Sequence, residues 1–169
     1  EIMIRKIKKV GADILFNCIT HSNIHDAIAL LDDNEVDVNA RNINGQTPLH
    51  FAVEAQNKTM IETFLQYGAD PNIQENEEIG FNTPLHRAAE KNMLDVMDLF
   101  LQCGGDPSIP NKNGFTCLHV AAKEGFLDMC KLLVTKGKCP VGLFCCYRTG
   151  LQHQRQIRVL GQLLGQAKQ

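Results

Sequence analysis

Tryptophan is absent from this sequence of 169 residues, and only two tyrosines occur in it. Apolar stretches are short: none reaches the length of about 18 residues that a membrane-spanning helix needs, so no such helix is expected. The glycine-rich loop that holds nucleotide phosphates, with its Lys-Ser/Thr ending, is also missing. We therefore expect no membrane span, no phosphate-loop nucleotide site and no cofactor.

Acidic residues are absent from 129–169, where seven basic residues occur. The preceding segment, 14–128, has the opposite balance, with 17 acidic and six basic residues. The net charge of −2 therefore conceals an acidic body followed by a basic tail. An acidic body disfavours direct contact with duplex phosphates, and it favours a protein partner whose surface is basic or mixed.

Seven cysteines are present, and four of them lie in segments with helical patterning. An odd number of cysteines, placed in helices, argues against a disulfide framework and for reduced thiols. The first residues also lack the charged, apolar and small-residue layout of a secretory signal. We therefore expect an intracellular protein, in the cytoplasm or the nucleus.

A repeated motif organises the middle of the chain. Thr-Pro-Leu-His occupies 47–50 and 83–86, and Thr-Cys-Leu-His occupies 116–119. The spacings of 36 and 33 residues are typical of solenoid proteins. Small residues and then an apolar stripe at helical spacing follow each motif, and each stripe ends at a glycine: Gly68, Gly104 and Gly137.

These motifs resemble the ankyrin-repeat family over about 36–137, and a fainter match without the tetrapeptide extends back to residue 13. The resemblance implies an all-α solenoid of stacked helix-turn-helix units with hairpin-like finger loops. A first, capping unit is expected to begin with a helix N-capped by Asp13. The expected segments are a basic extension (1–12), four units (13–41, 42–77, 78–110 and 111–141) and a non-repeat basic tail (142–169).

The recurring threonines and histidines are expected to be structural. A threonine before proline suits a helix N-cap, because proline in the first turn gives up no hydrogen bond. An identical histidine in every unit suits a hydrogen-bond network that links the cap threonine to the neighbouring finger backbone. These residues are Thr47, His50, Thr83, His86, Thr116 and His119.

Catalytic and metal sites find little support. Cys117 and His119 lie two residues apart, so at a helix start they do not face each other as a thiol and its base must. Metal ligands would have to come from the tail, where the spacing of Cys139, Cys145 and Cys146, with His153 as a further candidate, does not give the paired ligands of structural zinc. Reversible acylation of the adjacent cysteines has equally weak support. We expect no enzyme activity, no metal site and no small-molecule substrate.

Partner binding is the function that the resemblance implies, along a concave face made by the fingers and first helices. The second finger is three residues longer than the others, over 75–81, and its tip is expected to be acidic. Each candidate either contacts a partner or is only exposed to solvent. For Phe115 a further alternative is that it packs within its own finger. The finger candidates are Arg41, Ile43, Asn44, Gln46, Glu75, Glu77, Glu78, Ile79, Phe81, Asn82, Lys112, Asn113 and Phe115. The helix candidates are Phe51, Glu54, Arg87, Glu90, Lys91 and Lys123.

The resemblance also implies a modification. Intracellular ankyrin hairpins are often hydroxylated on asparagine where a leucine precedes Asp-Val-Asn by six positions. Leu31 and Asp37-Val38-Asn39 match that pattern. Asn39 is therefore predicted to be a hydroxylation site.

The two ends of the chain leave several interpretations open. The basic cluster Arg5, Lys6, Lys8 and Lys9 is either a solvated helix face, a nuclear signal or an anion contact. The tail, 138–169, either caps the last unit, is disordered, or replaces further repeats. A tail with this charge also leaves open a contact with an anionic membrane or a nucleic acid.

Overall fold

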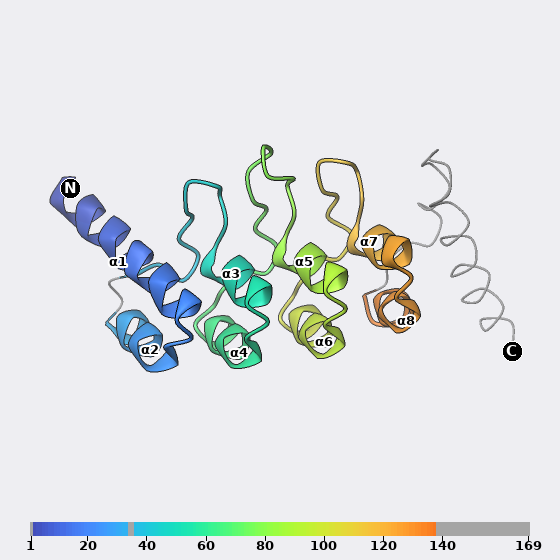
Figure 1. Ribbon diagram of the computed structural model, residues 1–169, viewed down its shortest axis with the longest axis horizontal. Coiled ribbons are helices and arrows are strands. Elements are labelled where there is room, and N and C mark those ends of the chain that lie inside the picture. Colours follow the sequence, from blue (N-terminus) through green and yellow to red (C-terminus); the bar gives the residue numbers. More distant parts are fainter. Residues whose placement is uncertain (1, 34–35, 138–169) are drawn as a thin grey trace, which may run out of the picture.

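The structure, a computed structural model, describes residues 2–33 and 36–137. Within these residues the chain forms eight α-helices and no β-strand. Successive helices pair into four helix-turn-helix units that stand side by side in a row (Figure 1). The helices are α1 (Ile2–Thr20), α2 (Ile24–Asp32), α3 (Pro48–Glu54), α4 (Lys58–Gln66), α5 (Pro84–Glu90), α6 (Leu94–Gln102), α7 (Cys117–Glu124) and α8 (Leu127–Thr135).

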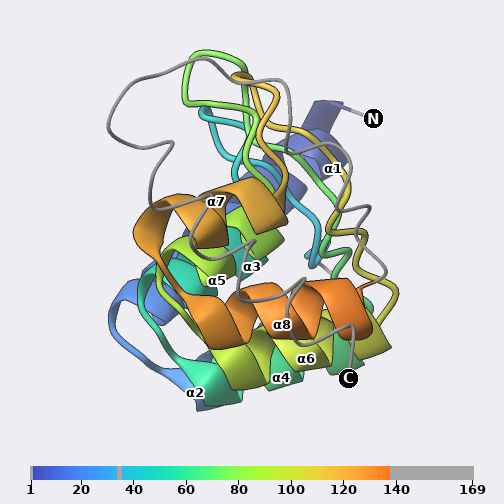
Figure 2. The same cartoon turned by 90° about the vertical axis from the view of Figure 1, so that its right-hand side faces the viewer.

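The helices form two layers, and the fingers project from one of them. The first helices of the units, α1, α3, α5 and α7, lie next to the fingers, and the second helices, α2, α4, α6 and α8, form the outer layer (Figure 2). Neighbouring units are in contact through α1 with α3, α3 with α5, α5 with α7, and α6 with α8. This architecture confirms the all-α solenoid expected from the sequence.

The repeated tetrapeptide begins the first helix of each later unit. Thr47, Thr83 and Thr116 are N-caps with extended backbone, as the sequence predicts for the first two. A proline follows two of them in the first turn, where its missing N–H leaves no partner unsatisfied. The threonine therefore sets the point at which each finger ends and each helix begins.

The core follows the small-residue and apolar stripes of the repeat. Ala52, Ala88 and Ala121 on the first helices are fully buried, which allows neighbouring units to approach closely. Phe64 on α4 and Phe100 on α6 are fully buried beneath them. Full burial of a phenylalanine contributes about 1.5–3 kcal/mol, so these stripes supply much of the stabilisation of each unit.

A left-handed residue turns the chain between the two helices of every unit. These residues are Ser22, Gln56, Asn92 and Gly125, with φ of 54°, 53°, 55° and 83°. Glycine takes this conformation freely, whereas a residue with a Cβ atom is strained in it. The second unit therefore carries backbone strain at Gln56.

Replacing Gln56 with glycine is expected to stabilise the protein by up to about 1 kcal/mol, because relief of the strain exceeds the entropy that glycine loses. Chemical denaturation measures the change in unfolding free energy. The matched variant Gly125→Ala places a Cβ atom at the same position of the last unit, so it should lower stability. Two changes of the same sign would contradict this account.

The first helix is longer than the sequence predicts. α1 begins at Ile2 and runs through Asp13, so Asp13 is not an N-cap, and residues 2–12 are part of a helix of the first unit. This unit has no Thr-Pro step to fix a helix start. Gly11 lies inside this helix at a point where Val36 packs closely: a Cβ atom there would be 2.6 Å from Val36 Cγ2.

In the part of the chain that the structure describes, no helix combines the length and the apolar character needed to cross a membrane.

Candidate functional site

His50 and His86 connect the first helices of their units, α3 and α5, to the next finger. Nδ1 of His50 accepts the backbone N–H of its cap residue, Thr47, at 3.1 Å, and lies 2.9 Å from the hydroxyl Oγ1 of Thr47. A ring nitrogen that accepts an N–H carries no proton, so the proton of the neutral ring is on Nε2. Nε2 donates it to the carbonyl oxygen of Asn82, at 3.2 Å. His50 therefore joins α3 to the second finger.

The later histidines repeat this arrangement. Nδ1 of His86 accepts the N–H of Thr83 at 3.2 Å, and Nε2 donates to the carbonyl oxygen of Phe115 at 2.9 Å. Nδ1 of His119 accepts the N–H of Thr116 at 3.2 Å. Burial lowers the pKa of His50 to about 4, and burial also lowers the pKa of His86. Both ring nitrogens of His50 and His86 are engaged and both rings are kept neutral by burial, so they act as structural connections.

Hydrogen bonds also join neighbouring fingers to each other. The guanidinium of Arg41 donates to the carbonyl oxygen of Gln74 at 2.7 Å. The side-chain amide of Gln74 donates in turn to the carbonyl oxygen of Pro110 at 2.9 Å. Backbone N–H groups continue the series, from Asn76 to Asn44 and from Lys112 to Gly80, each at 2.9 Å. The three fingers therefore form one connected surface.

The sequence prediction for Glu75 in the long finger is wrong. The prediction placed it in an exposed acidic tip, but its side chain is fully buried. The asparagine at the same position of the other fingers, Asn42 or Asn111, accepts two backbone N–H groups of its own finger at 2.9–3.0 Å. The long finger has a glutamate at this position, and its carboxylate contacts Arg87 on α5.

Four hydrogen bonds hold this carboxylate. Nη2 of Arg87 donates to Oε1 and Oε2 of Glu75 at 3.0 and 3.2 Å. The side-chain amide of Asn82 donates to Oε1 at 2.8 Å, and that of Gln46 donates to Oε2 at 3.3 Å. The donors come from the first finger, the second finger and α5. We call these four residues the Glu75 cluster; it fixes the long finger against two neighbouring units.

Arg87 extends the cluster to other charged groups. Its Nε lies 3.5 Å from Glu54 Oε1, an ion-pair distance at which it makes no hydrogen bond. Its Nη1 lies 3.4 Å from Glu90, and Lys91 forms a 3.0 Å ion pair with Glu54. Solvent screens these outer pairs, so they contribute little stability. They form a charged surface beside the fingers.

A hollow of about 160 Å³ brings six of the predicted partner-binding residues together. It lies between the second and third fingers and the first helices α5 and α7. Phe115 forms part of its wall, half-buried and stacked on His119 at a centroid distance of 5.9 Å, so it also packs within its own finger. The predicted residues that line it are Asn82, Arg87, Glu90, Asn113, Phe115 and Lys123.

A second hollow, of about 640 Å³, lies between α1 and the first finger. Arg41 and Ile43 of the finger and Phe16 of α1 are among the residues that line it. Phe16 contacts Phe51 of α3, with ring centroids 4.9 Å apart. The first unit therefore contributes to the same face as the later units.

The finger tips carry the remaining predicted residues. Glu77 and Glu78 are exposed in the long finger, together with Ile79 and Phe81. Ile43 at the tip of the first finger is 90% exposed. The extra residues thus place apolar and acidic side chains in solvent, at the end of the finger that Glu75 holds.

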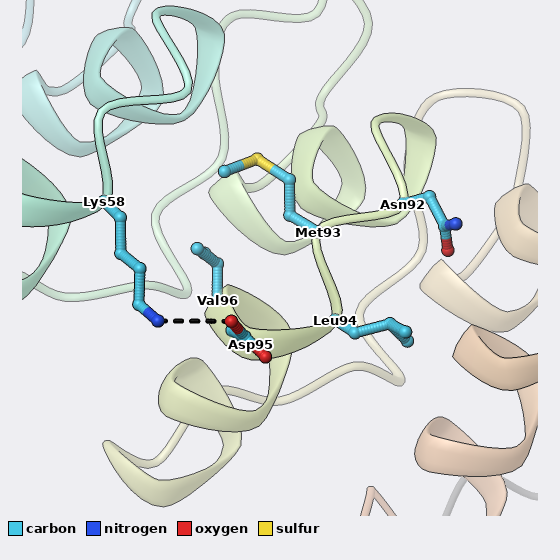
Figure 3. Close-up of a pocket in the computed structure, with 6 residues that line it drawn as sticks. All are labelled: Lys58, Asn92, Met93, Leu94, Asp95 and Val96. Atoms are coloured by element: carbon cyan, nitrogen blue, oxygen red, sulfur yellow. Dashed lines mark hydrogen bonds and ion pairs between the residues drawn. The ribbon is translucent and has the colours of Figure 1, made fainter.

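A further pocket, of about 310 Å³, lies away from the predicted residues, at the starts of α4 and α6. An ion pair of 3.2 Å between Lys58 and Asp95 lies at its edge, and Met93, Leu94 and Val96 line it (Figure 3). The lining residues named here therefore comprise one exposed ion pair and three apolar side chains. They offer no nucleophile with a base, so we assign no chemistry to this pocket.

The residues considered in the sequence as reactive or metal-binding groups are either buried or outside the described residues. Cys117 and His119 are both buried in α7, and burial raises the pKa of Cys130 on α8 to about 12. Among the described residues, no group of three His, Cys, Asp or Glu side chains is placed to hold a metal ion. Cys139, Cys145, Cys146 and His153, and the tail 138–169, lie outside the described residues.

Asn39, the predicted hydroxylation site, joins two units. Its side-chain oxygen accepts the backbone N–H of Asp70 at 2.8 Å, and its amide donates to the carbonyl oxygen of Gly68 at 3.3 Å. Asn72 makes the same two contacts with Asp106 and Gly104 one unit later. The side chain of Asn39 is half-buried, and its hydroxylation stays a prediction.

Four stacked helix-turn-helix units with connected fingers define a repeat solenoid whose candidate residues gather beside the fingers. The family model for ankyrin repeats (3 copies) matches residues 3–75 and 73–143. The chain belongs to the ankyrin-repeat family.

Relatives of known name match shorter segments. NF-kappa-B inhibitor alpha of Sus scrofa is 36% identical over 103 residues, which cover 59% of this chain and 33% of that protein. The Homo sapiens protein of the same name is 36% identical over 103 residues, covering 59% and 32%. An ankyrin repeat protein of Fowlpox virus (strain NVSL) is 47% identical over 38 residues, covering 22% and 6%. The matched segment spans about a third of NF-kappa-B inhibitor alpha.

Proposed function

We propose that this chain is an intracellular protein-binding module, a scaffold or adaptor without enzyme activity. It binds its partner through the face formed by the fingers and first helices. The observation that carries the proposal is the hollow between the second and third fingers, which six predicted residues line. The partner is a protein with a basic or mixed surface, because the exposed groups of this face include both carboxylates and lysines.

Pre-organisation supports this function. Histidine rings and finger-to-finger hydrogen bonds hold the binding face before any partner arrives. A face that needs no ordering loses less conformational entropy on binding than a flexible loop does. The cross-linked fingers are therefore suited to binding a broad protein surface.

The named relatives suggest a first partner to test. By its name, NF-kappa-B inhibitor alpha inhibits NF-kappa-B, and its similarity to this chain extends over 103 residues. We therefore propose NF-kappa-B as the protein with which binding is measured first.

Charge reversal at Glu90 is expected to weaken that binding about tenfold, which corresponds to about 1.4 kcal/mol. Glu90 lines the hollow and forms an i,i+3 ion pair of 3.4 Å with Arg87. Isothermal titration calorimetry of wild type and Glu90→Lys measures the change. Thermal unfolding of both proteins checks that the fold is retained.

The matched control is Asp128→Lys on α8. Asp128 also forms an i,i+3 ion pair of 3.4 Å, with Lys131, but it belongs to the outer layer. This variant should bind as wild type does. Equal affinities for all three proteins, or an equal loss in both variants, would contradict binding through the finger face.

A second candidate function rests on the charge of the tail, 138–169, which carries five basic residues and no acidic one. In this alternative the tail binds an anionic membrane or a nucleic acid. Affinity for anionic vesicles or for duplex DNA should then fall steeply with salt. Replacement of the tail's basic residues by glutamine should abolish it; unchanged affinity would exclude this alternative.

A further inference from the structure

Three apolar side chains and two carboxylates are exposed together at the ends of the first two fingers. Ile43 is 90% exposed, Ile79 41% and Phe81 37%. Glu77 and Glu78, which precede Ile79 in the long finger, are also exposed. We call these five residues the finger-tip patch. Apolar side chains exposed together beside charged groups mark a candidate interaction site.

Asn76 holds the two halves of the patch together. Its side-chain amide donates to the carbonyl oxygen of Ile43 at 2.9 Å. Its own carbonyl oxygen accepts the backbone N–H groups of Ile79, Gly80 and Phe81 at 3.0, 3.1 and 3.3 Å. The spacing between Ile43 and the Ile79–Phe81 pair is therefore fixed by one residue.

The backbone at Phe81 has a conformation in which glycine would be less strained. The position two residues before the cap threonine is Gly45 in the first finger and Gly114 in the third, with φ of 72° and 73°. The long finger has Phe81 at that position, with φ of 56°. A bulky residue rarely adopts this conformation. The chain thus keeps an exposed aromatic ring where glycine is the relaxed choice.

The charges of the patch favour a cation. Among the residues that the structure describes, Glu77 and Glu78 form no ion pair, so both carboxylates are open to a partner. Lys112 is exposed in the third finger, and its backbone N–H donates to the carbonyl oxygen of Gly80. The carboxylates of the patch therefore belong to the long finger. The nearest finger on the other side from Ile43 is the third finger, which carries the exposed Lys112.

We propose that the finger-tip patch binds one protein segment in which a large apolar side chain adjoins a lysine or arginine. The apolar side chain packs on Ile43, Ile79 and Phe81, and the basic group pairs with Glu77 or Glu78. This inference rests on the proposed function, protein binding, and assigns one part of the binding face to one kind of partner sequence.

Selection from a display library of random short peptides tests the chemistry directly, with immobilised full-length protein as the target. Wild type should enrich peptides in which Leu, Ile, Phe or Trp adjoins Arg or Lys. The double variant Glu77→Lys/Glu78→Lys should instead enrich peptides in which the same apolar residues adjoin Asp or Glu. Enrichment of the same sequences by both proteins would overturn the proposal, and so would no enrichment by wild type.

Ile79→Ser tests the apolar part, with Ile14→Ser on α1 as the matched control, because Ile14 is 44% exposed. A synthetic peptide chosen by wild type should lose at least about tenfold in affinity for Ile79→Ser and should bind Ile14→Ser unchanged. Phe81→Gly should bind the peptide more weakly while its melting temperature rises. A merely structural Phe81 would give the opposite change in melting temperature.

The outcomes separate this inference from the proposed function. If Glu90→Lys weakens NF-kappa-B binding but the finger-tip variants leave peptide selection unchanged, the chain binds proteins through another part of the face, and this inference is wrong. If the peptide results hold and NF-kappa-B does not bind, the finger-tip patch stands with a different protein as its partner.

Discussion

Replacing Glu75 with alanine is expected to lower the free energy of unfolding by about 3 kcal/mol, the loss typical of a buried ion pair that keeps only one partner. The carboxylate is fully buried and accepts hydrogen bonds from Arg87, Asn82 and Gln46. Its removal leaves three partly buried donors without their acceptor. Urea denaturation followed by circular dichroism measures the change.

Two comparisons make this prediction specific. Glu77→Ala removes an exposed carboxylate from the same finger, so it should change stability by less than about 0.5 kcal/mol. A double-mutant cycle with Arg87→Ala should show strong coupling, because Arg87→Ala leaves the fully buried Glu75 carboxylate without its cation. Similar losses for Glu75→Ala and Glu77→Ala, or additive effects in the cycle, would refute the role assigned to the buried pair.

Acidification should destabilise the array between about pH 6.5 and pH 4. Burial lowers the pKa of His50 from 6.5 in the unfolded chain to about 4, so the unfolded chain binds more protons in this range. The stabilisation from neutral His50 is therefore complete above about pH 6.5 and is lost as the pH falls to 4. At about 1.4 kcal/mol for each pKa unit, its size is about 3 kcal/mol.

The variant His50→Gln isolates this effect from the titration of carboxylates. The difference in unfolding free energy between wild type and His50→Gln should shrink as the pH falls from 6.5 to 4. Burial lowers the pKa of His86 as well, so His86→Gln should show the same trend. A difference that stays constant over this range would mean that the ring is not kept neutral by the fold.

The sequence predicts most of this fold because the same helix-capping arrangement recurs in successive units. A threonine that caps a helix and a histidine that bonds back to it recur at fixed distances, as at Thr47 and His50. Each copy supports the assignment of the others, and the buried stripes follow from the same period. The first unit lacks this start signal, so the sequence predicts an N-cap at Asp13, and this prediction is wrong because α1 begins at Ile2.

Glu75 is a residue whose burial differs from the exposure that its sequence context predicts. An acidic residue in an insertion is normally solvated, so the sequence prediction placed it in an exposed tip. Counting five residues forward from the turn aspartate gives Asn42 from Asp37, Glu75 from Asp70 and Asn111 from Asp106. That register marks Glu75 as the base of the finger, where asparagine normally bonds. The distant donor Arg87, by contrast, has no signal in the local sequence.

The position of the Glu75 cluster sets how the array comes apart. The cluster joins the first finger to the second finger and α5, and so bridges the second and third units of four. A break there leaves two pairs of units, and a pair is smaller than the roughly three repeats that a solenoid needs. The array has no spare unit at its centre. The array should therefore unfold only by fraying from its ends or as a whole. Neither pair of units is expected to stay folded after the other has unfolded.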